Sequence, residues 1–172
     1  PRIIDGDTIE IAGERVRLHG IDAPETNQSC RGADGNLWAC GRQSTSVLRS
    51  LISGGSVVCK GREQDRYKRL IAVCFSGHKD LNAELVKQGW ALAYRKYSTD
   101  YVLQERNAKS EKVGIWSGQF VTPWEWRKGK RLKSKIVNSC CKICRKGKAC
   151  GNSCISRTNI CHKPLGCACN AN

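Results

Sequence analysis

Two short segments near the start of the chain combine acidic residues with an arginine. The first is Asp5-Gly6-Asp7-Thr8, and the second covers residues 17–25 with the sequence RLHGIDAPE. Clustered carboxylates can hold a hard cation, a further carboxylate can activate a water molecule, and a guanidinium can stabilise the charge that gathers on a phosphate. This combination of residue types predicts a metal-dependent site that hydrolyses phosphodiester bonds.

A third segment, Asp65-Arg66-Tyr67-Lys68-Arg69, supplies a second guanidinium. Two guanidinium groups suit a phosphate, because each is planar, keeps its charge and can donate two parallel hydrogen bonds. Simpler roles compete with this one. Arg17 could pair with Glu10 or Glu14 across a hairpin, which is the usual fate of a charge on a strand face. Arg69 could belong to a solvated basic face.

The elements that position these residues follow from hydrophobic spacing and turn residues. Strands are predicted at residues 2–11, 15–21, about 56–60 and 68–76. Helices are predicted at residues 41–53, 81–88 and about 100–112. Asp5 is expected to cap a turn beside the metal site, since Asp-Gly is a common turn pair. This order favours a mixed α+β, mainly β fold: a five-stranded Greek-key barrel of the OB type with about three packed helices.

The same residues resemble the staphylococcal nuclease family. The resemblance extends from about residue 3 to residue 116 and includes five ordered motifs, at residues 4–8, 17–25, 65–69, 81–89 and 114–116. It implies an OB fold and a calcium-dependent phosphodiesterase that cleaves DNA and RNA without sequence specificity and leaves 3′-phosphate ends. Oxygen ligands also favour calcium, with magnesium as a substitute, over zinc.

The resemblance implies a role in metal binding and water activation for four residues. Asp7 and Asp22 correspond to the two metal-binding carboxylates, and Ala23 occupies the position whose backbone carbonyl joins them. Glu25 corresponds to the residue that activates or orients the attacking water. A proline at position 24 stiffens the turn before Glu25, so Glu25 can lie near that water without being a tight metal ligand.

The resemblance implies substrate contacts for four further residues, and Arg66 is also predicted to contact the substrate. Arg17 and Arg69 correspond to the pair that grips the scissile phosphate. Tyr67, next to Arg66, corresponds to a tyrosine that contacts phosphate, and Tyr94 to one that packs against a nucleotide base. Phosphate clamps and stacking aromatic rings contact the backbone and the faces of the bases, so no sequence specificity is expected.

Three features depart from the family pattern. Lys68 stands where glycine is common before the second arginine, so the loop that aims Arg69 is in question. The loop between Glu25 and the first predicted helix contains Cys30 and Cys40 and differs from the staphylococcal archetype. The tail beyond about residue 130 has no counterpart in the minimal nuclease.

Twelve cysteines divide into two even groups. Four lie in the body of the chain, at Cys30, Cys40, Cys59 and Cys74, and eight lie after residue 139. Cys30 and Cys40 bracket a loop, and Cys59 and Cys74 lie in two strands that could be neighbours, so two disulfides are feasible here. This cysteine usage favours an oxidising compartment, and we expect a secreted or periplasmic protein.

The last part of the chain is strongly basic. All 15 Asp and Glu lie at or before Glu125, whereas 12 of the 30 Lys and Arg follow Trp126. We predict a nuclease domain at residues 1–126, a basic linker at 127–139 and a cysteine-rich basic module at 140–172. Four disulfides are favoured over Zn²⁺ for the module, although the CKIC spacing at 141–144 keeps zinc open. The charge predicts an anionic partner, with nucleic acid first and an anionic cell surface next.

Two functions stay open from the sequence alone. The chain is either an active nuclease or an OB-fold nucleic-acid-binding module that has lost catalysis. The joint presence of Arg17, Glu25 and Arg69 favours the enzyme, because a decayed site would have lost at least one of them. No run approaches the roughly 20 apolar residues that span a bilayer. We therefore expect no membrane span and no signal peptide. We also expect the protein to be a monomer.

Overall fold

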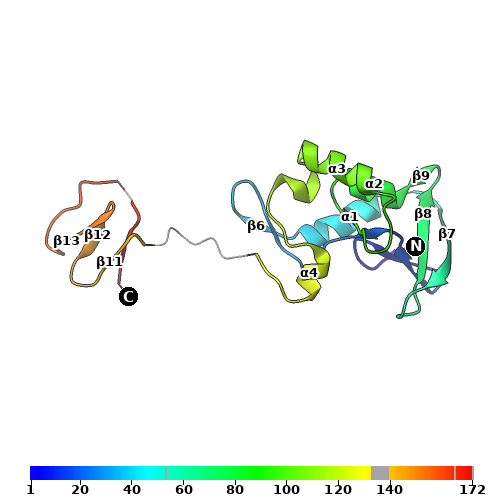
Figure 1. Cartoon of the computed structure of the whole chain (residues 1–172), viewed down its shortest axis with the longest axis horizontal. Coiled ribbons are helices and arrows are strands. Elements are labelled where there is room, and N and C mark those ends of the chain that lie inside the picture. Colours follow the sequence, from blue (N-terminus) through cyan, green and yellow to red (C-terminus); the bar gives the residue numbers. More distant parts are fainter. Residues whose placement is uncertain (53, 133–139, 165, 172) are drawn as a thin grey trace. The chain divides into compact units, whose positions relative to one another are not determined.

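The chain forms two compact units. The computed structural model describes residues 1–52, 54–132, 140–164 and 166–171, and contacts divide the chain into Pro1–Leu132 and Lys133–Asn172 (Figure 1). Of the predicted basic linker at 127–139, residues 133–139 lie outside the described residues. Within the described ranges, no helix has both the length and the apolar character that crossing a bilayer requires.

A six-stranded sheet is the main β layer of the first unit. Its strands are β1 (Arg2–Ile3), β2 (Thr8–Ile11), β3 (Glu14–Leu18), β7 (Val57–Gln64), β8 (Leu70–Ser76) and β9 (Lys79–Asp80). The order is β1-β2-β3-β8-β7, with β9 paired to β8. β3 and β8 run parallel, whereas β2 and β3, and β7 and β8, run antiparallel. The curled sheet confirms the mixed, mainly β fold predicted from the sequence.

Four α-helices accompany this sheet, one more than predicted. α1 (Cys40–Ile52), α2 (Leu81–Lys87) and α3 (Val102–Glu111) correspond to the three predicted helices, and a 3₁₀ turn, η1, covers Gly114–Ser117. The additional helix, α4 (Pro123–Arg127), ends one residue beyond the predicted limit of the first domain at 126. Pro123 suits its first turn, where a backbone N–H has no partner, and Thr122 Oγ1 donates to Glu125 Oε2 over 3.0 Å.

Among the described residues of the first unit, two further strand pairs lie outside the main sheet. β4 (Ile21–Asp22) pairs with β10 (Leu92–Ala93), and β5 (Cys30–Arg31) pairs with β6 (Leu37–Trp38). The second pair lies inside the predicted loop between Glu25 and the first helix, and a disulfide joins Cys30 to Cys40. That loop is therefore a stapled hairpin rather than an irregular segment.

The predicted strand at residues 2–11 is interrupted by a turn. Between β1 and β2, Asp5 Oδ1 accepts a hydrogen bond from the backbone N–H of Asp7 over 3.0 Å, so Asp5 caps this turn. The turn passes close to α1, because a Cβ on Gly6 would lie 2.3 Å from Ser44 Oγ. The period-two alternation of the sequence did not reveal this break in the strand. The turn places Asp7 close to residues that follow β2 in the chain.

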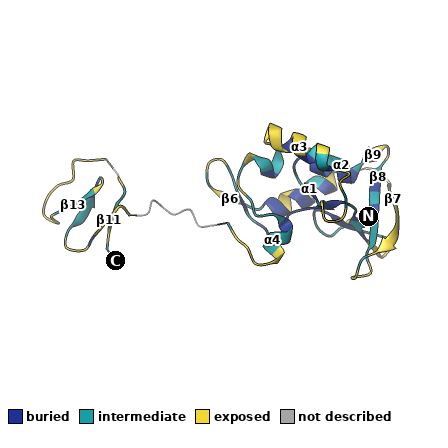
Figure 2. Cartoon of the chain, viewed as in Figure 1, coloured by how far each residue is buried: buried dark blue, intermediate teal, exposed yellow. Residues whose placement is uncertain are grey.

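The apolar core of the first unit lies between the sheet and the helices. Figure 2 shows buried residues along the sides of the helices and strands that face one another, while β7 and the outer side of α3 are exposed. The largest completely or almost completely buried apolar side chains are Ile9, Leu18, Ile21, Leu48, Leu81, Leu85 and Ile115. Each such side chain contributes about 1.5–3 kcal/mol on burial, which gives the site a rigid support.

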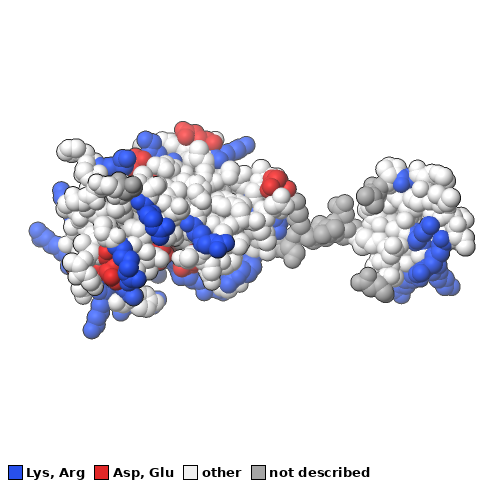
Figure 3. Space-filling model, turned by 180° about the vertical axis from the view of Figure 1, so that it is seen from behind, with Lys and Arg blue, Asp and Glu red and all other residues white. Residues whose placement is uncertain are grey.

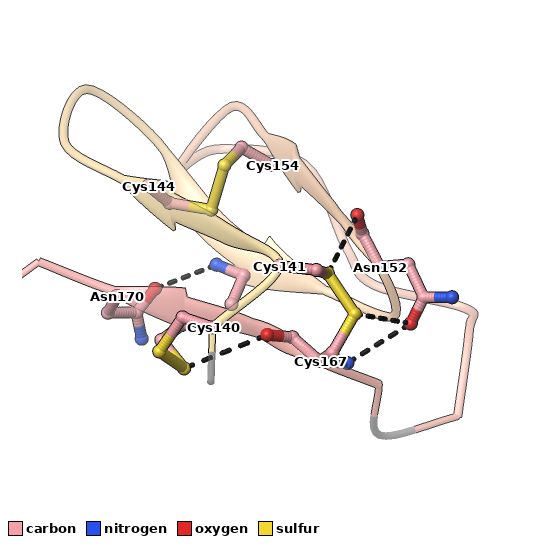
Figure 4. The surroundings of a disulfide bond; sticks show 9 residues. Cys140, Cys141, Cys144, Asn152, Cys154, Cys167 and Asn170 are labelled. Atoms are coloured by element: carbon pink, nitrogen blue, oxygen red, sulfur yellow. Dashed lines mark hydrogen bonds between the residues drawn. A yellow bond between two sulfur atoms is a disulfide. The ribbon is translucent and has the colours of Figure 1, made fainter. Parts of the chain in front are cut away.

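The second unit is held together by disulfides rather than by an apolar core. Its strands are β11 (Lys142–Cys144), β12 (Lys148–Cys150), β13 (Ser153–Ile155) and β14 (Ala168–Asn170). Its four disulfides are Cys140–Cys169, Cys141–Cys167, Cys144–Cys154 and Cys150–Cys161. Side chains add to these links, as Figure 4 shows: Asn152 Oδ1 accepts from the backbone N–H of Cys167 over 3.1 Å, and Asn170 Oδ1 from that of Ala149 over 2.7 Å.

All eight cysteines of this unit are used in disulfides, so none is left as a thiolate for zinc. In the first unit, disulfides join Cys30 to Cys40 and Cys59 to Cys74, which are the two pairs predicted. Cys59 and Cys74 face each other across β7 and β8. Small units without a core commonly depend on such covalent links.

Candidate active site

Arg17 brings two of the predicted metal-binding residues together. It lies on β3 opposite Thr8 of β2, its Nη2 donates to Asp22 Oδ1 over 2.7 Å, and its guanidinium also pairs with Asp7. The alternative partner, Glu10, instead accepts from Arg2 Nη2 over 2.7 Å. Arg17 therefore faces the carboxylate cluster rather than the hairpin surface.

This cluster is buried. Asp22 is 0 % exposed and Asp7 is 6 % exposed. Burial lowers the pKa of Arg17, against the raising influence of Asp22 and Asp5, and burial also raises the pKa of Asp5. Charged groups out of water are costly unless they are paired, and such groups are concentrated at functional sites.

Ala23 lies directly against Asp7. Its backbone N–H donates to Asp7 Oδ2 over 2.6 Å, and Ala23 is itself buried. Asp7, Asp22 and Ala23 thus lie together, as the resemblance implied. Their carboxylate and carbonyl oxygens are the ligands that Ca²⁺ and Mg²⁺ prefer, so the donor set fits a hard divalent cation.

Glu25 is held at the cluster by Arg127, a residue that the sequence analysis assigned to the linker. Arg127 Nη1 donates to Glu25 Oε1 over 2.7 Å and to Asp22 Oδ1 over 3.0 Å. Its Nη2 donates to Asp22 Oδ2 over 2.7 Å. Partial burial lowers the pKa of Arg127, but hydrogen bonds to Asp22 and Glu25 outweigh it, so the pKa is raised.

Arg69 lies in the loop between β7 and β8 and is oriented by Asp65. Asp65 Oδ2 accepts from Arg69 Nε over 2.7 Å, and Asp65 Oδ1 accepts from the backbone N–H of Arg69 over 3.0 Å. Burial raises the pKa of Asp65, but these hydrogen bonds outweigh it and the pKa is lowered. Arg69 Nη1 reaches Thr8 Oγ1 at 3.5 Å. Arg69 is thus a fixed group beside the residue that follows Asp7, not one of a solvated basic face.

Lys68 adopts a left-handed backbone conformation, with φ of 61°. Glycine reaches this region without a steric penalty, which explains why glycine suits the position. The loop closes with lysine all the same, because Lys68 N donates to Asp65 O over 2.9 Å and Asp65 N donates to Arg69 O over 3.0 Å. Lysine in place of glycine at position 68 therefore does not turn Arg69 away from the carboxylate cluster.

The predicted substrate-binding tyrosines lie in different parts of the first unit. Tyr67 is 64 % exposed, accepts from Arg66 Nη2 over 2.7 Å, and has the Arg69 guanidinium 5.4 Å from its ring centroid. Tyr94 follows β10, the strand that pairs with Ile21 and Asp22. Its ring stacks on Trp124 of α4, with centroids 5.3 Å apart and planes at 4°. Trp124 thus anchors α4 to the segment that follows β10.

Residues 15–118 match the family model described as staphylococcal nuclease homologue. The chain is 41% identical over 123 residues to the succinoglycan biosynthesis protein ExoI of Rhizobium meliloti (strain 1021), covering 68% of this chain and 63% of that protein. It is 36% identical over 134 residues to an uncharacterized endonuclease of Escherichia coli O157:H7, covering 73% and 81%.

A third relative is the micrococcal nuclease of Shigella flexneri, 32% identical over 148 residues, which cover 76% of this chain and 79% of that protein. The family match includes Arg17, Glu25 and Arg69 and ends before α4. The family also accounts for the OB type of the curled sheet. The chain therefore belongs to the staphylococcal nuclease homologue family, which places it among the nucleases that hydrolyse phosphodiester bonds.

Proposed function

We propose that this protein hydrolyses DNA and RNA without sequence specificity, uses a divalent cation, calcium first, and leaves 3′-phosphate ends. The observation that carries the proposal is one buried cluster of charged side chains. In it, Arg17 contacts Asp7 and Asp22, and Arg127 contacts both Asp22 and Glu25. This one place combines candidate metal ligands, a candidate base and a guanidinium. A binding module would need none of these in a buried arrangement.

Asp7, Asp22 and the carbonyl of Ala23 would hold the cation. When bound, the cation lowers the pKa of a coordinated water and neutralises phosphate oxygens. Glu25 is the group that accepts the proton of the attacking water, because it is a carboxylate at the edge of the cluster with its side chain 32% exposed.

Arg17 and Arg69 act on the phosphate. Each guanidinium can donate two hydrogen bonds to phosphate oxygens, and both stay charged as negative charge grows in the transition state. Asp65 fixes the Arg69 side chain before substrate arrives, so little conformational entropy is lost on binding. Tyr67, exposed beside Arg69, offers a hydroxyl for a neighbouring phosphate.

We propose that the second unit increases affinity for nucleic acid. The Lys and Arg of its described part are Lys142, Arg145, Lys146, Lys148, Arg157 and Lys163, and the sequence places no Asp or Glu after Glu125. In Figure 3 most of the blue surface on the visible face of this unit forms one patch, and a smaller blue area lies apart from it. Positive charge of this kind binds phosphates by releasing counterions, independently of sequence.

We also propose that the protein works in an oxidising compartment, either outside the cell or in the periplasm. All 12 cysteines form six disulfides, including the four of a unit with very little apolar core. Disulfides of this density do not persist among cytosolic thiols.

The test of the proposed function is cleavage of single-stranded DNA, duplex DNA and RNA by the purified, non-reduced protein. Each substrate is incubated with calcium, with magnesium and with a chelator, and the ends of the products are analysed. The proposal predicts cleavage with calcium, none with chelator, and 3′-phosphate ends. Nucleic-acid binding without cleavage under every metal would instead support an inactive binding module.

A further inference from the structure

We propose that Arg127 is a positioning residue that fixes the carboxylate of Glu25 for hydrolysis, an inference that rests on the proposed function of Glu25. Arg127 lies on α4, outside the range that matches the family model. Its Nη1 atom lies 2.7 Å from Glu25 Oε1 and 3.0 Å from Asp22 Oδ1. Nη1 of Arg127 thus links the carboxylate of Glu25 to the completely buried carboxylate of Asp22.

Glu25 needs such a partner because its own segment leaves the side chain free to turn. Glu25 follows Pro24, outside any helix or strand, and its side chain is 32% exposed. In the part of the chain that the structure describes, Arg127 is the one ion-pair partner of Glu25. Without Arg127, the carboxylate could occupy several rotamers, most of them away from Asp22.

The backbone of Glu25 is tied to the same C-terminal segment. Gln28, which is 0 % exposed, donates from its backbone N–H to Glu25 O over 2.7 Å. Its side-chain Oε1 accepts from Glu25 N over 3.2 Å, and its Nε2 donates to Val121 O over 2.6 Å. Gln28 therefore joins the backbone of Glu25 to the segment that leads into α4.

Other contacts hold α4 in place. Trp124 stacks on Tyr94, which follows the strand paired to Asp22, and it lies one helical turn from Arg127 and on the same side of the helix. Before α4, Arg31 and Gln119 exchange two backbone hydrogen bonds of 2.8 Å. Arg127 is thus supported by a rigid segment, as an accurate positioning group requires.

The geometry calls for arginine rather than lysine. The Arg127 guanidinium contacts both oxygens of Asp22 and one of Glu25, which takes two nitrogens in one plane. A lysine ammonium is a point charge and cannot reproduce this fork. Misplacing a reacting group by about 1 Å costs about 10²-fold in rate, so a lysine should keep the fold and lose turnover.

The first test compares Arg127→Lys and Arg127→Ala with the wild type in steady-state cleavage kinetics. We expect kcat to fall about 10-fold in Arg127→Lys and about 10²-fold in Arg127→Ala, with KM changed less than about threefold. Added guanidinium ion should restore part of the activity of Arg127→Ala. Arg2→Ala is the matched control, because Arg2 makes a similar two-pronged pair with Glu10 on the surface, and its activity should not change.

The second test repeats the change in a Glu25→Gln background. If Arg127 acts through Glu25, adding Arg127→Lys to Glu25→Gln should lower kcat less than about twofold, because the two effects are not additive. An equal fall in both backgrounds would overturn the proposal. So would wild-type turnover in Arg127→Lys, or a calorimetric loss of Ca²⁺ binding by that variant, since Arg127 would then act through Asp22. A wild type that cleaves nothing would instead refute the proposed function itself, and the inference with it.

Discussion

Arg17 donates from Nη2 to Oδ1 of Asp22 over 2.7 Å, and Asp22 is completely buried. Arg17 belongs to β3 and Asp22 to β4, so this contact joins the hairpin of β2 and β3 to the strand that follows it. The same guanidinium pairs with Asp7 on the other side. Arg17 thus balances the charge of two buried carboxylates, which would be costly if left unpaired.

Replacing Arg17 by lysine should therefore be damaging although the charge is kept. Lysine cannot contact Asp7 and Asp22 at once, so one of the two carboxylates loses a charged hydrogen bond, at a cost of about 1.5–3 kcal/mol in the free energy of unfolding. The loss of the phosphate contact should lower kcat by about 10²-fold or more. Urea denaturation and cleavage kinetics measure the two effects. Arg15→Lys changes an exposed arginine of β3 and is the control, and equal behaviour of the two variants would contradict the assignment.

The disulfide Cys30–Cys40 should matter for turnover, whereas Cys59–Cys74 should matter for stability alone. Serine replacements of either pair should cost about 2–4 kcal/mol of stability. The first pair staples the hairpin that follows Glu25, so its loss should also lower kcat by about 10-fold at constant temperature. The second pair lies between two strands that remain hydrogen-bonded. Equal kcat values in both double variants would show that the stapled hairpin does not position Glu25.

Lys68→Gly should stabilise the protein. Lys68 has φ of 61°, a region that costs a non-glycine residue about 1–2 kcal/mol. The free energy of unfolding should rise by about 1 kcal/mol, after the entropy that glycine gains in the unfolded chain is subtracted. Lys68→Ala removes the same charge without relieving the backbone, so it should bring no gain. If both variants change stability equally in urea denaturation, the effect comes from the charge.

Removing residues 135–172 should weaken nucleic-acid binding most at low salt. Each phosphate contact that is lost lowers the slope of log K against log salt by about 0.9, so we expect a slope shallower by about 2–4. A full-length variant with Lys146→Gln, Lys148→Gln and Arg157→Gln keeps all the cysteines and should show part of the same change. A slope that stays the same in both proteins would mean that the second unit does not touch the nucleic acid.

The sequence predicted the parts of the fold that have a strong local signal. Apolar spacing located α1, α2 and α3, and β-rich runs placed Cys59 and Cys74 in the neighbouring strands β7 and β8. The sequence grouped Arg17 with three aspartates, Asp5, Asp7 and Asp22, and the structure places them together. All four residues lie in the short stretch of chain from β1 to β4. The spatial proximity of residues that are close in sequence can be predicted from local structure alone.

The parts that the sequence missed depend on tertiary contacts. α4 has five residues, too few for a helical period, and its contacts with Asp22, Glu25 and Tyr94 come from distant parts of the chain. Arg127 therefore looked like one more cation of a basic linker. The turn at Asp5 was expected from the Asp-Gly pair and is confirmed by its side-chain cap. The continuous strand predicted at residues 2–11 was wrong, because this cap and the lack of space at Gly6 interrupt it.

The role of Glu25 as the base is tested by comparing Glu25→Gln with the wild type in cleavage and in DNA binding. Glutamine keeps the size of the side chain and can still bond Arg127, but it cannot accept the proton of water. The account predicts a fall in kcat of about 10²–10⁴-fold, with the Kd for duplex DNA changed less than about threefold. Turnover equal to that of the wild type would contradict the account, because Glu25 would then have no part in the reaction.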